Sequence, residues 1–280
     1  MMKIKNSIVF FLIAITMNFE SVSQEIGLQL YSLRNEMKDD VEGTLQKIQS
    51  WGISNIEEGN GGTHGYSIQD YKALLNKNQL KIVSVSGSYE DFRDNPEKII
   101  SKAKAYGAKY AVCFWIPHND TIFTIKETKA AIDVFNKAGK KLKDAGITLA
   151  YHPHGYEFRP YKKGLLMDHM IESAQHFTFE MDVYWFAHPG ENPIEWLRRY
   201  PDKFKLMHLK DCKKGVKGNL NGTSDVETNV VLGMGQINIA AIVAEAVKIQ
   251  IDYLFIEDES SKAVKQIPQS LKFLQSSLDK

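Results

Sequence analysis

Cysteine is nearly absent from this 280-residue chain, which contains only Cys113 and Cys212. So few cysteines exclude a small domain held together by a disulfide framework. Each of the two looks attached to a different predicted core strand. We therefore predict two buried free thiols, not a disulfide.

An excess of charge of one sign is also absent. The chain carries 35 Lys and Arg against 34 Asp and Glu, a formal net charge of +1. This balance gives no electrostatic bias toward nucleic acid or anionic membranes. No Pro/Gly/Ser-rich linker, charge run or low-complexity tract divides the chain, so we expect one domain over residues 24–280.

The first 23 residues have the pattern of a secretory signal peptide. They hold two lysines, an apolar run of roughly a dozen residues, and small residues at Ser21 and Ser23. We predict cleavage before Gln24 and export to the periplasm or the cell exterior. The apolar run is short for a membrane span, although an uncleaved anchor is the alternative. After cleavage we expect no stable membrane insertion.

Short β-branched or aromatic runs alternate with longer amphipathic stretches from Gln24 onward, which is typical of repeated strand–helix units around a parallel sheet. We predict eight strands, each followed by a helical pattern. The expected strands are residues 26–32, 55–59, 81–87, 110–116, 148–154, 179–185, 204–211 and 253–259. This count favours a single (β/α)8 TIM barrel over the alternative, a doubly wound open sheet.

Side chains that can bind metal recur where the last four predicted strands end. They are His152 and His154 in "YHPH", Asp182 in "EMDVYW", His208 in "MHLKD", and Glu257 with Glu259 in "IEDE". Chemistry in such barrels lies at the carboxyl ends of the strands, so these groups should meet at one mouth. The alternation of side chains along each strand turns His152 with His154, Glu180 with Asp182 and Tyr184, and His208 with Lys210 to one face.

Two imidazoles and two carboxylates suit Mn²⁺, Zn²⁺, Co²⁺ or Fe²⁺ better than Ca²⁺ or Mg²⁺. We therefore predict one divalent metal ion held by His152, Asp182, His208 and Glu257. The alternative, four unrelated buried polar groups, requires four costly burials to be satisfied separately.

The chain resembles the xylose-isomerase-like TIM barrels, a superfamily that includes sugar phosphate isomerases and epimerases, an inosose dehydratase and the endonuclease IV group. The resemblance covers the whole predicted mature chain. Its motifs are "GLQLYSLR", "YHPHGYEF", "MDVYWFAHPGENPIEWLRRYPDKFKLMHLKD", "LGMGQINI" and "IEDE".

In the epimerases of that superfamily a Glu, an Asp, a His and a Glu on strands five to eight hold the metal. The resemblance implies Asp182, His208 and Glu257 as ligands, whereas His152 occupies the position of the first glutamate. Those enzymes share proton removal and return between their two glutamates, so this departure removes half of a two-base mechanism. We predict Glu157, or failing that His154, as a free base beside Glu257.

Further polar and aromatic groups should surround a hydroxylated ligand at this mouth. Lys210 could hold a carbonyl or oxyanion, with a solvated surface lysine as the alternative. The predicted substrate-binding residues are Gln29, Tyr31, Glu57, Trp115, Tyr184, Trp185 and His188. The polar segment 212–235 is long for a βα loop and is expected to cover the substrate.

These observations predict a metal-dependent sugar isomerase or epimerase that forms an enediolate on a sugar or keto-sugar. Because His152 favours a single-base outcome, the first alternative is a lyase or dehydratase acting by β-elimination on a keto-sugar or glycoside. The second alternative is a non-catalytic sugar-binding barrel. An endonuclease is disfavoured, because the chain lacks a basic face for DNA and the many His and Glu ligands of a three-metal cluster.

Overall fold

The computed structural model describes residues 24–59, 62–119 and 122–279, so the predicted signal peptide lies outside the described residues. Eight parallel strands form a closed barrel in which β12 pairs with β1 and the chain order is otherwise kept around the ring. The strands are β1 (Glu25–Gln29), β2 (Asn55–Glu57), β3 (Lys81–Gly87), β4 (Tyr110–Cys113), β5 (Thr148–Tyr151), β8 (Thr178–Asp182), β9 (Phe204–Leu209) and β12 (Tyr253–Ile256). The predicted (β/α)8 barrel is confirmed.

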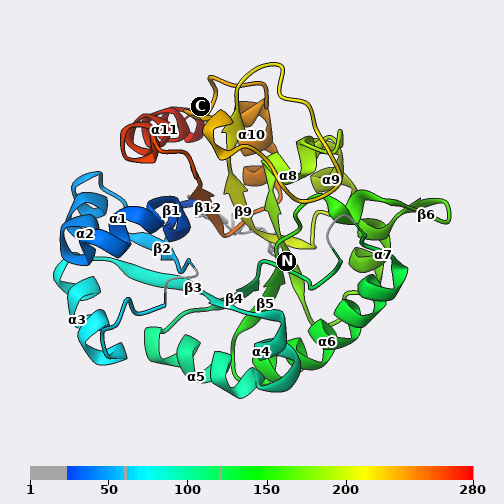
Figure 1. Cartoon of the computed structure of the whole chain (residues 1–280), viewed down its shortest axis with the longest axis horizontal. Helices are drawn as coiled ribbons and strands as arrows, with labels where there is room; N and C mark the ends of the chain where they lie inside the picture. The colour runs from blue at the N-terminus through cyan, green and yellow to red at the C-terminus, as the bar shows by residue number, and fades with distance from the viewer. Residues whose placement is uncertain (1–23, 60–61, 120–121, 280) are drawn as a thin grey trace, which may run out of the picture.

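Helices surround the barrel on its outside (Figure 1). They are α1 (Arg34–Asp39), α2 (Val41–Ser50), α3 (Ile68–Lys77), α4 (Tyr89–Asp94), α5 (Pro96–Tyr106), α6 (Ile125–Asp144), α7 (Leu166–Ser173), α8 (Val183–Ala187), α9 (Pro193–Arg199), α10 (Ile239–Lys248) and α11 (Ala263–Leu278). Within the described residues, none of these helices has the length and apolar character needed to cross a membrane.

The loops between strands and helices contain short hairpins and 3₁₀ turns. Two antiparallel hairpins pair β6 (Pro160–Tyr161) with β7 (Gly164–Leu165) and β10 (Asp211–Cys212) with β11 (Asn229–Val230). The described part of the chain also contains the 3₁₀ turns η1 (Leu30–Leu33), η2 (Tyr156–Phe158) and η3 (Val226–Thr228). Cys113 lies in barrel strand β4 and Cys212 in hairpin strand β10, and both cysteines are buried and free, as predicted.

Local sequence explains where the elements begin and how the barrel closes. Helix α6 begins with a capping box, in which Thr124 and Glu127 satisfy each other's backbone N–H groups. Gly27 on β1 is required by close packing, since a Cβ at this position would lie 2.5 Å from the Phe255 ring. The Phe255 ring fills the part of the barrel interior that a side chain at position 27 of β1 would otherwise occupy.

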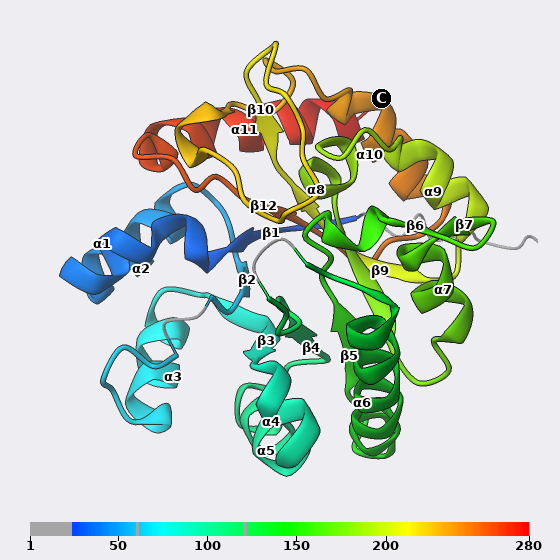
Figure 2. The same ribbon diagram turned by 45° about the vertical axis from the view of Figure 1, so that its right-hand side comes forward.

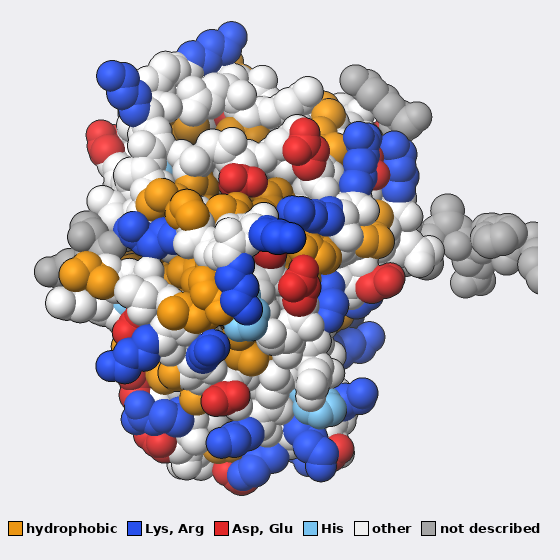
Figure 3. Space-filling view, turned by 90° about the vertical axis from the view of Figure 1, so that its right-hand side faces the viewer, with side chains coloured by type: hydrophobic (Ala, Val, Ile, Leu, Met, Phe, Trp, Pro, Cys, Tyr) orange, Lys and Arg blue, Asp and Glu red, His pale blue; other side chains and the backbone are white. Residues whose placement is uncertain are grey.

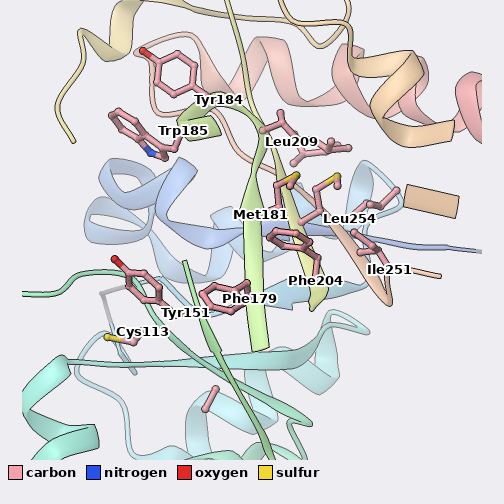
Figure 4. Close-up of a cluster of buried hydrophobic side chains, with 14 of the residues drawn as sticks. Cys113, Tyr151, Phe179, Met181, Tyr184, Trp185, Phe204, Leu209, Ile251 and Leu254 are labelled. Carbon is pink, nitrogen blue, oxygen red and sulfur yellow. The ribbon is translucent and has the colours of Figure 1, made fainter. Parts of the chain in front are cut away.

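Apolar side chains pack on both faces of the strands. Inside the barrel, a compact cluster is formed by Tyr110, Val112, Ala150, Leu206, Tyr253 and Phe255. Outside, side chains such as Phe179, Met181 and Phe204 pack in a much larger cluster between strands and helices (Figure 4). The filled interior closes the barrel from below, so a ligand can approach only from the end that carries the polar side chains.

The molecular surface bears charges of both signs. Lys and Arg side chains and Asp and Glu side chains are interspersed over the face drawn in Figure 3. This distribution agrees with the near-zero net charge of the sequence.

The predicted strands were right in number and order but most ran too far at their carboxyl ends. The strand predicted over 179–185 ends at Asp182, because the Asp182 carboxylate accepts hydrogen bonds from the backbone N–H groups of Tyr184 and Trp185. This cap starts α8. Tyr184 is therefore helical, and the strand alternation that placed it on the face of Asp182 does not apply.

Candidate metal centre and pocket

Four side chains from four adjacent barrel strands converge at the carboxyl end of the barrel. His152 follows β5, Asp182 ends β8, His208 lies in β9 and Glu257 follows β12. One potential ligand atom from each residue lies within 4.8 Å of the corresponding atoms of the other three. These are the four residues that the sequence analysis grouped, so the structure brings the predicted set together.

The four side chains are almost completely buried, with exposed fractions from 0% for Asp182 to 8% for Glu257. His152 Nε2 lies 3.5 Å from Asp182 Oδ2, and His208 Nδ1 lies 3.3 Å from Glu257 Oε2. Neither ring nitrogen of His152 has a hydrogen bond, and Asp182 Oδ2 and His208 Nδ1 also lack one. Buried polar atoms without partners are costly, and a divalent cation at their centre would satisfy them.

The electrostatics of the cluster also suit a cation. Burial would lower the pKa of His208, but the carboxylates of Glu180, Glu257 and Glu57 raise it well above its usual value. Burial would raise the pKa of Glu257, but Lys210 and His208 hold it well below its usual range. Carboxylate groups therefore outnumber the cationic side chains around the cluster, so the cluster carries an excess of negative charge.

Lys210 supplies a positive charge at the edge of this cluster. Its side chain is buried, and Nζ donates a hydrogen bond to Glu259 Oε1 at 2.5 Å. The same nitrogen lies 2.9 Å from Glu257 Oε2 and 3.5 Å from Asp182 Oδ2. The rings of Tyr184 and Trp185 lie 5.6 Å from it. The alternative of a solvated surface lysine is thus excluded.

A pocket of about 440 Å³ opens above the four convergent residues. It is lined by Gln29, Tyr31, Gly59, Phe114, Trp115, His152, His154, Trp185, Lys210, Gly222, Thr223, Ser224, Val226, Glu257 and Glu259. Apolar and aromatic walls with a few convergent polar groups are typical of small-molecule sites. Of the seven predicted substrate-binding residues, Gln29, Tyr31, Trp115 and Trp185 line this pocket.

The other three predicted substrate-binding residues lie behind the pocket wall. Glu57 is fully buried and contacts His208. Tyr184 stacks on His188, with ring centroids 4.8 Å apart, and His188 Nε2 bonds to the Asn219 side-chain amide at 2.9 Å. Their positions correct the predicted direct contacts: Glu57 supports the cluster from below, and Tyr184 with His188 supports the loop after β10.

Glu157 also lies outside the pocket lining. It is fully buried, and Tyr151 OH and the backbone N–H of His154 donate to its carboxylate. Burial raises the pKa of Glu157 to about 7. The turn at Gly155, with φ of +97°, and the 3₁₀ turn η2 direct the side chain under the loop. This position does not fit the predicted role of a free base facing the substrate.

His154, the second predicted base, does line the pocket. Its ring lies between Trp115 and Trp185, with centroid distances of 5.3 Å and 5.4 Å. Its Nδ1 atom has no hydrogen bond, and its backbone is held by Glu157. The imidazole is therefore oriented by its aromatic neighbours at the pocket lining.

The loop after β9 forms one side of the pocket. Hairpin β10–β11 frames residues 213–228, and Gly222, Thr223, Ser224 and Val226 contribute to the lining. Figure 2 shows this part of the chain as the yellow segment that carries the label β10. The Asp211 carboxylate anchors its base by accepting hydrogen bonds from the backbone of Gly233 and Gly235. Segment 212–235 thus contributes to the wall of the pocket; its role as a cover stays a prediction.

Two features of the site were not predicted. Phe114 lines the pocket and stacks on His208, with ring centroids 6.0 Å apart. Glu180 lies below Asp182 on β8, with Oε1 3.3 Å from His208 Nε2, and burial next to Glu57 raises its pKa to about 8. The alternation of strand β8 placed Glu180 on the inner face, but its partner His208 is not evident from sequence spacing.

The fold of this chain is similar to that of several proteins with solved structures. A sugar phosphate isomerase/epimerase from Parabacteroides distasonis is 23% identical, with a TM-score of 0.76 over 93% of this chain and 98% of that one. The IolI protein, whose crystal structure contains a zinc atom, is 15% identical, with a TM-score of 0.70 over 91% of this chain and 98% of that one. At these identities the similarity establishes the fold.

Among curated proteins, the inosose dehydratase of Mesomycoplasma hyopneumoniae is 26% identical over 202 residues, which cover 68% of this chain and 60% of that enzyme. The chain spans less than two thirds of the length of the inosose dehydratases that it matches. The family model described as xylose isomerase-like TIM barrel matches residues 45–277. The resemblance found in the sequence motifs is confirmed, and the chain belongs to the xylose isomerase-like TIM barrel family.

Proposed function

We propose that the protein is a divalent-metal-dependent enzyme of the sugar isomerase/epimerase type, which moves a proton at a carbon next to a sugar carbonyl or hydroxyl group. The observation that carries this proposal is the convergence of His152, Asp182, His208 and Glu257 beside the pocket, whose lining includes His152 and Glu257. A bound Mn²⁺, Zn²⁺, Co²⁺ or Fe²⁺ ion would polarise a substrate oxygen and so acidify the adjacent C–H bond.

The residues around the metal centre have different proposed roles in the reaction. Lys210 is a buried cation beside Glu257, so its ammonium group can stabilise negative charge that develops on a substrate oxygen. His154 lines the pocket between Trp115 and Trp185 and is the best placed group to accept the proton. Tyr31, Trp115 and Trp185 supply aromatic faces for the apolar side of a sugar ring.

β-Elimination is the second candidate reaction. It is favoured by His152, because a histidine in place of the first of the two glutamates leaves one candidate base and not a symmetric pair. Elimination requires one base and a leaving group next to the carbanion, whereas epimerisation by two bases requires a donor on the opposite face. Support also comes from the curated relatives, which are inosose dehydratases.

The deciding experiment measures hydrogen exchange at carbon. Purified protein would first be analysed for bound metal, then incubated in D₂O with a panel of keto-sugars, inososes and glycosides. We expect deuterium at the carbon next to the carbonyl, with an isomer or epimer as product. An unsaturated product that has lost water or an alcohol would instead establish elimination.

Matched histidine variants provide the controls for this experiment. His154→Gln should retain metal and reduce exchange by roughly 10²-fold or more, the usual contribution of a general base. His176→Gln alters a histidine that precedes β8 at the opposite end of the barrel, and it should exchange at the wild-type rate. If the wild-type protein binds sugar but binds no metal and incorporates no deuterium into the sugar, an enzymatic function would be contradicted and a sugar-binding barrel favoured.

A further inference from the structure

The two ring nitrogens of His208 face different groups. Nδ1 points toward the convergent cluster, where it lies 3.3 Å from Glu257 Oε2 and has no hydrogen bond. Nε2 points into the barrel, where it contacts Glu57 Oε2 at hydrogen-bonding distance and lies 3.3 Å from Glu180 Oε1. One imidazole therefore links the pocket floor to a pair of carboxylates beneath it.

Glu57 and Glu180 are both fully buried inside the barrel. Glu57 ends β2, across the ring from β9, and its Oε2 atom also accepts a hydrogen bond of 2.9 Å from Gln29 Nε2. A carboxylate oxygen accepts and does not donate, so the shared hydrogen belongs to His208 Nε2. Gln29 and the end of β2 thus hold Glu57 in a position that selects the tautomer of His208 with its hydrogen on Nε2.

We propose that Glu57 is the positioning residue for the metal centre: it fixes the proton of His208 on Nε2 and thereby presents Nδ1 to the metal. Glu180 places a second carboxyl group on the same side of the ring, with Oε1 3.3 Å from His208 Nε2. Metal-binding histidines are commonly oriented in this way, by a carboxylate on the nitrogen that does not bind the metal. The inference rests on the proposed metal-dependent function and deepens it.

A second cation between Glu57, Glu180 and His208 is the competing explanation, because ligand atoms of these residues also lie within 4.8 Å of one another. The positioning role is favoured by the contact between His208 Nε2 and Glu57, which already occupies the space between these two side chains.

The first test uses the wild-type protein and needs no substitution. Protein labelled with ¹⁵N-histidine and loaded with one equivalent of Zn²⁺ would be examined by proton–nitrogen correlation NMR, with His208→Gln used to assign the signal. We expect His208 to carry its hydrogen on Nε2 and to bind zinc through Nδ1. A hydrogen on Nδ1, or two zinc ions bound tightly per chain, would overturn the proposal.

The second test measures zinc affinity by calorimetric titration of metal-free variants. Glu57→Gln keeps the size of the side chain but removes its charge, and we expect its zinc dissociation constant to rise roughly 10- to 100-fold. The matched control is Glu58→Gln, the next residue, which is equally buried but bonds to Ser86 and Lys102. It should bind zinc like the wild type, even if its melting temperature falls.

These outcomes separate the inference from the proposed function. If Glu57→Gln and Glu58→Gln bind zinc equally well, the positioning role is wrong while the metal site stands. If the wild-type protein binds no zinc, manganese, cobalt or iron, the proposed function itself fails. If Glu57→Gln does not fold, the hydrogen position in the wild-type spectrum decides the matter.

Discussion

Lys210 Nζ lies 2.9 Å from Glu257 Oε2, so a buried ammonium group directly adjoins a carboxylate of the convergent cluster. This ion pair gives Lys210 two opposite effects. Its charge can stabilise a developing oxyanion in the pocket, but it also repels a cation that binds at Glu257.

Lys210→Met should therefore separate catalysis from metal binding. We expect carbon–hydrogen exchange to fall by roughly 10²- to 10³-fold, the cost of losing one electrostatic contact to an oxyanion, while metal affinity stays the same or increases. Exchange rates and metal titration measure the two effects. Lys102→Met, which removes the partner of Glu58, is the control and should change neither. Loss of metal in Lys210→Met would show that the lysine only maintains the structure of the cluster.

Glu157 gives a pH-dependent prediction for stability. Its carboxyl group has a pKa of about 7 in the folded protein because it is buried, against 4.5 for an ordinary glutamate. A raised folded-state pKa means that its contribution to stability is fully present below pH 4.5 and is lost as the pH rises through 7. The loss would amount to about 3 kcal/mol across this window.

Glu157→Gln should remove this dependence, because a glutamine remains neutral. Urea unfolding of metal-free protein at pH 4.5 and pH 7.5 should show the variant gaining stability relative to the wild type as the pH increases. Because Glu157 does not line the pocket, carbon–hydrogen exchange should be largely retained. A 10²-fold loss of exchange with metal still bound would restore Glu157 as the base.

The loop after β10, which contributes to the wall of the pocket, is packed tightly against the structure beneath it. A Cβ atom at Gly218 would lie 1.4 Å from the backbone oxygen of His188, so alanine at this position must displace the loop. Gly218→Ala should raise KM for the substrate by roughly tenfold, with unchanged metal affinity, because the loop walls the pocket without contributing to the cluster. Lys217→Ala, an exposed neighbour, serves as the control. Unaltered KM in Gly218→Ala would argue against a substrate-covering role.

The barrel was predictable because its pattern is repetitive. Eight apolar runs alternate with amphipathic stretches, and each strand begins close to its predicted residue. The carboxyl ends were less predictable, since hydrogen bonds such as that from Tyr184 N–H to the Asp182 carboxylate end a strand where hydrophobicity continues. Sequence periodicity does not reveal where a side chain caps the backbone.

The pocket floor was predictable for the same geometric reason, because consecutive parallel strands end at one rim. Contacts between strands that are distant in the sequence were not predictable. Glu57 was expected to contact substrate, yet it meets His208, 151 residues away, across the barrel interior. Glu157 was predicted as a free base from its proximity to His152 and His154 in the chain, but its carboxylate accepts hydrogen bonds from Tyr151 OH and the His154 backbone N–H and does not line the pocket.

The N-terminal segment gives a prediction that is independent of the site. If residues 1–23 are a cleaved signal peptide, the protein recovered from its native host should begin at Gln24 and be found in the periplasm or the medium. N-terminal sequencing of the native protein measures this directly. A cytoplasmic protein that retains the segment would exclude export.

The metal content of purified variants tests the central claim most directly. Wild-type protein and His176→Ala should each bind one divalent ion per chain, whereas His208→Ala and Asp182→Ala should bind at least 10²-fold more weakly, because each loses one of about four ligands. Elemental analysis after dialysis against trace metal gives the stoichiometry. If His208→Ala and Asp182→Ala are folded and retain as much metal as the wild type, the proposed centre is wrong.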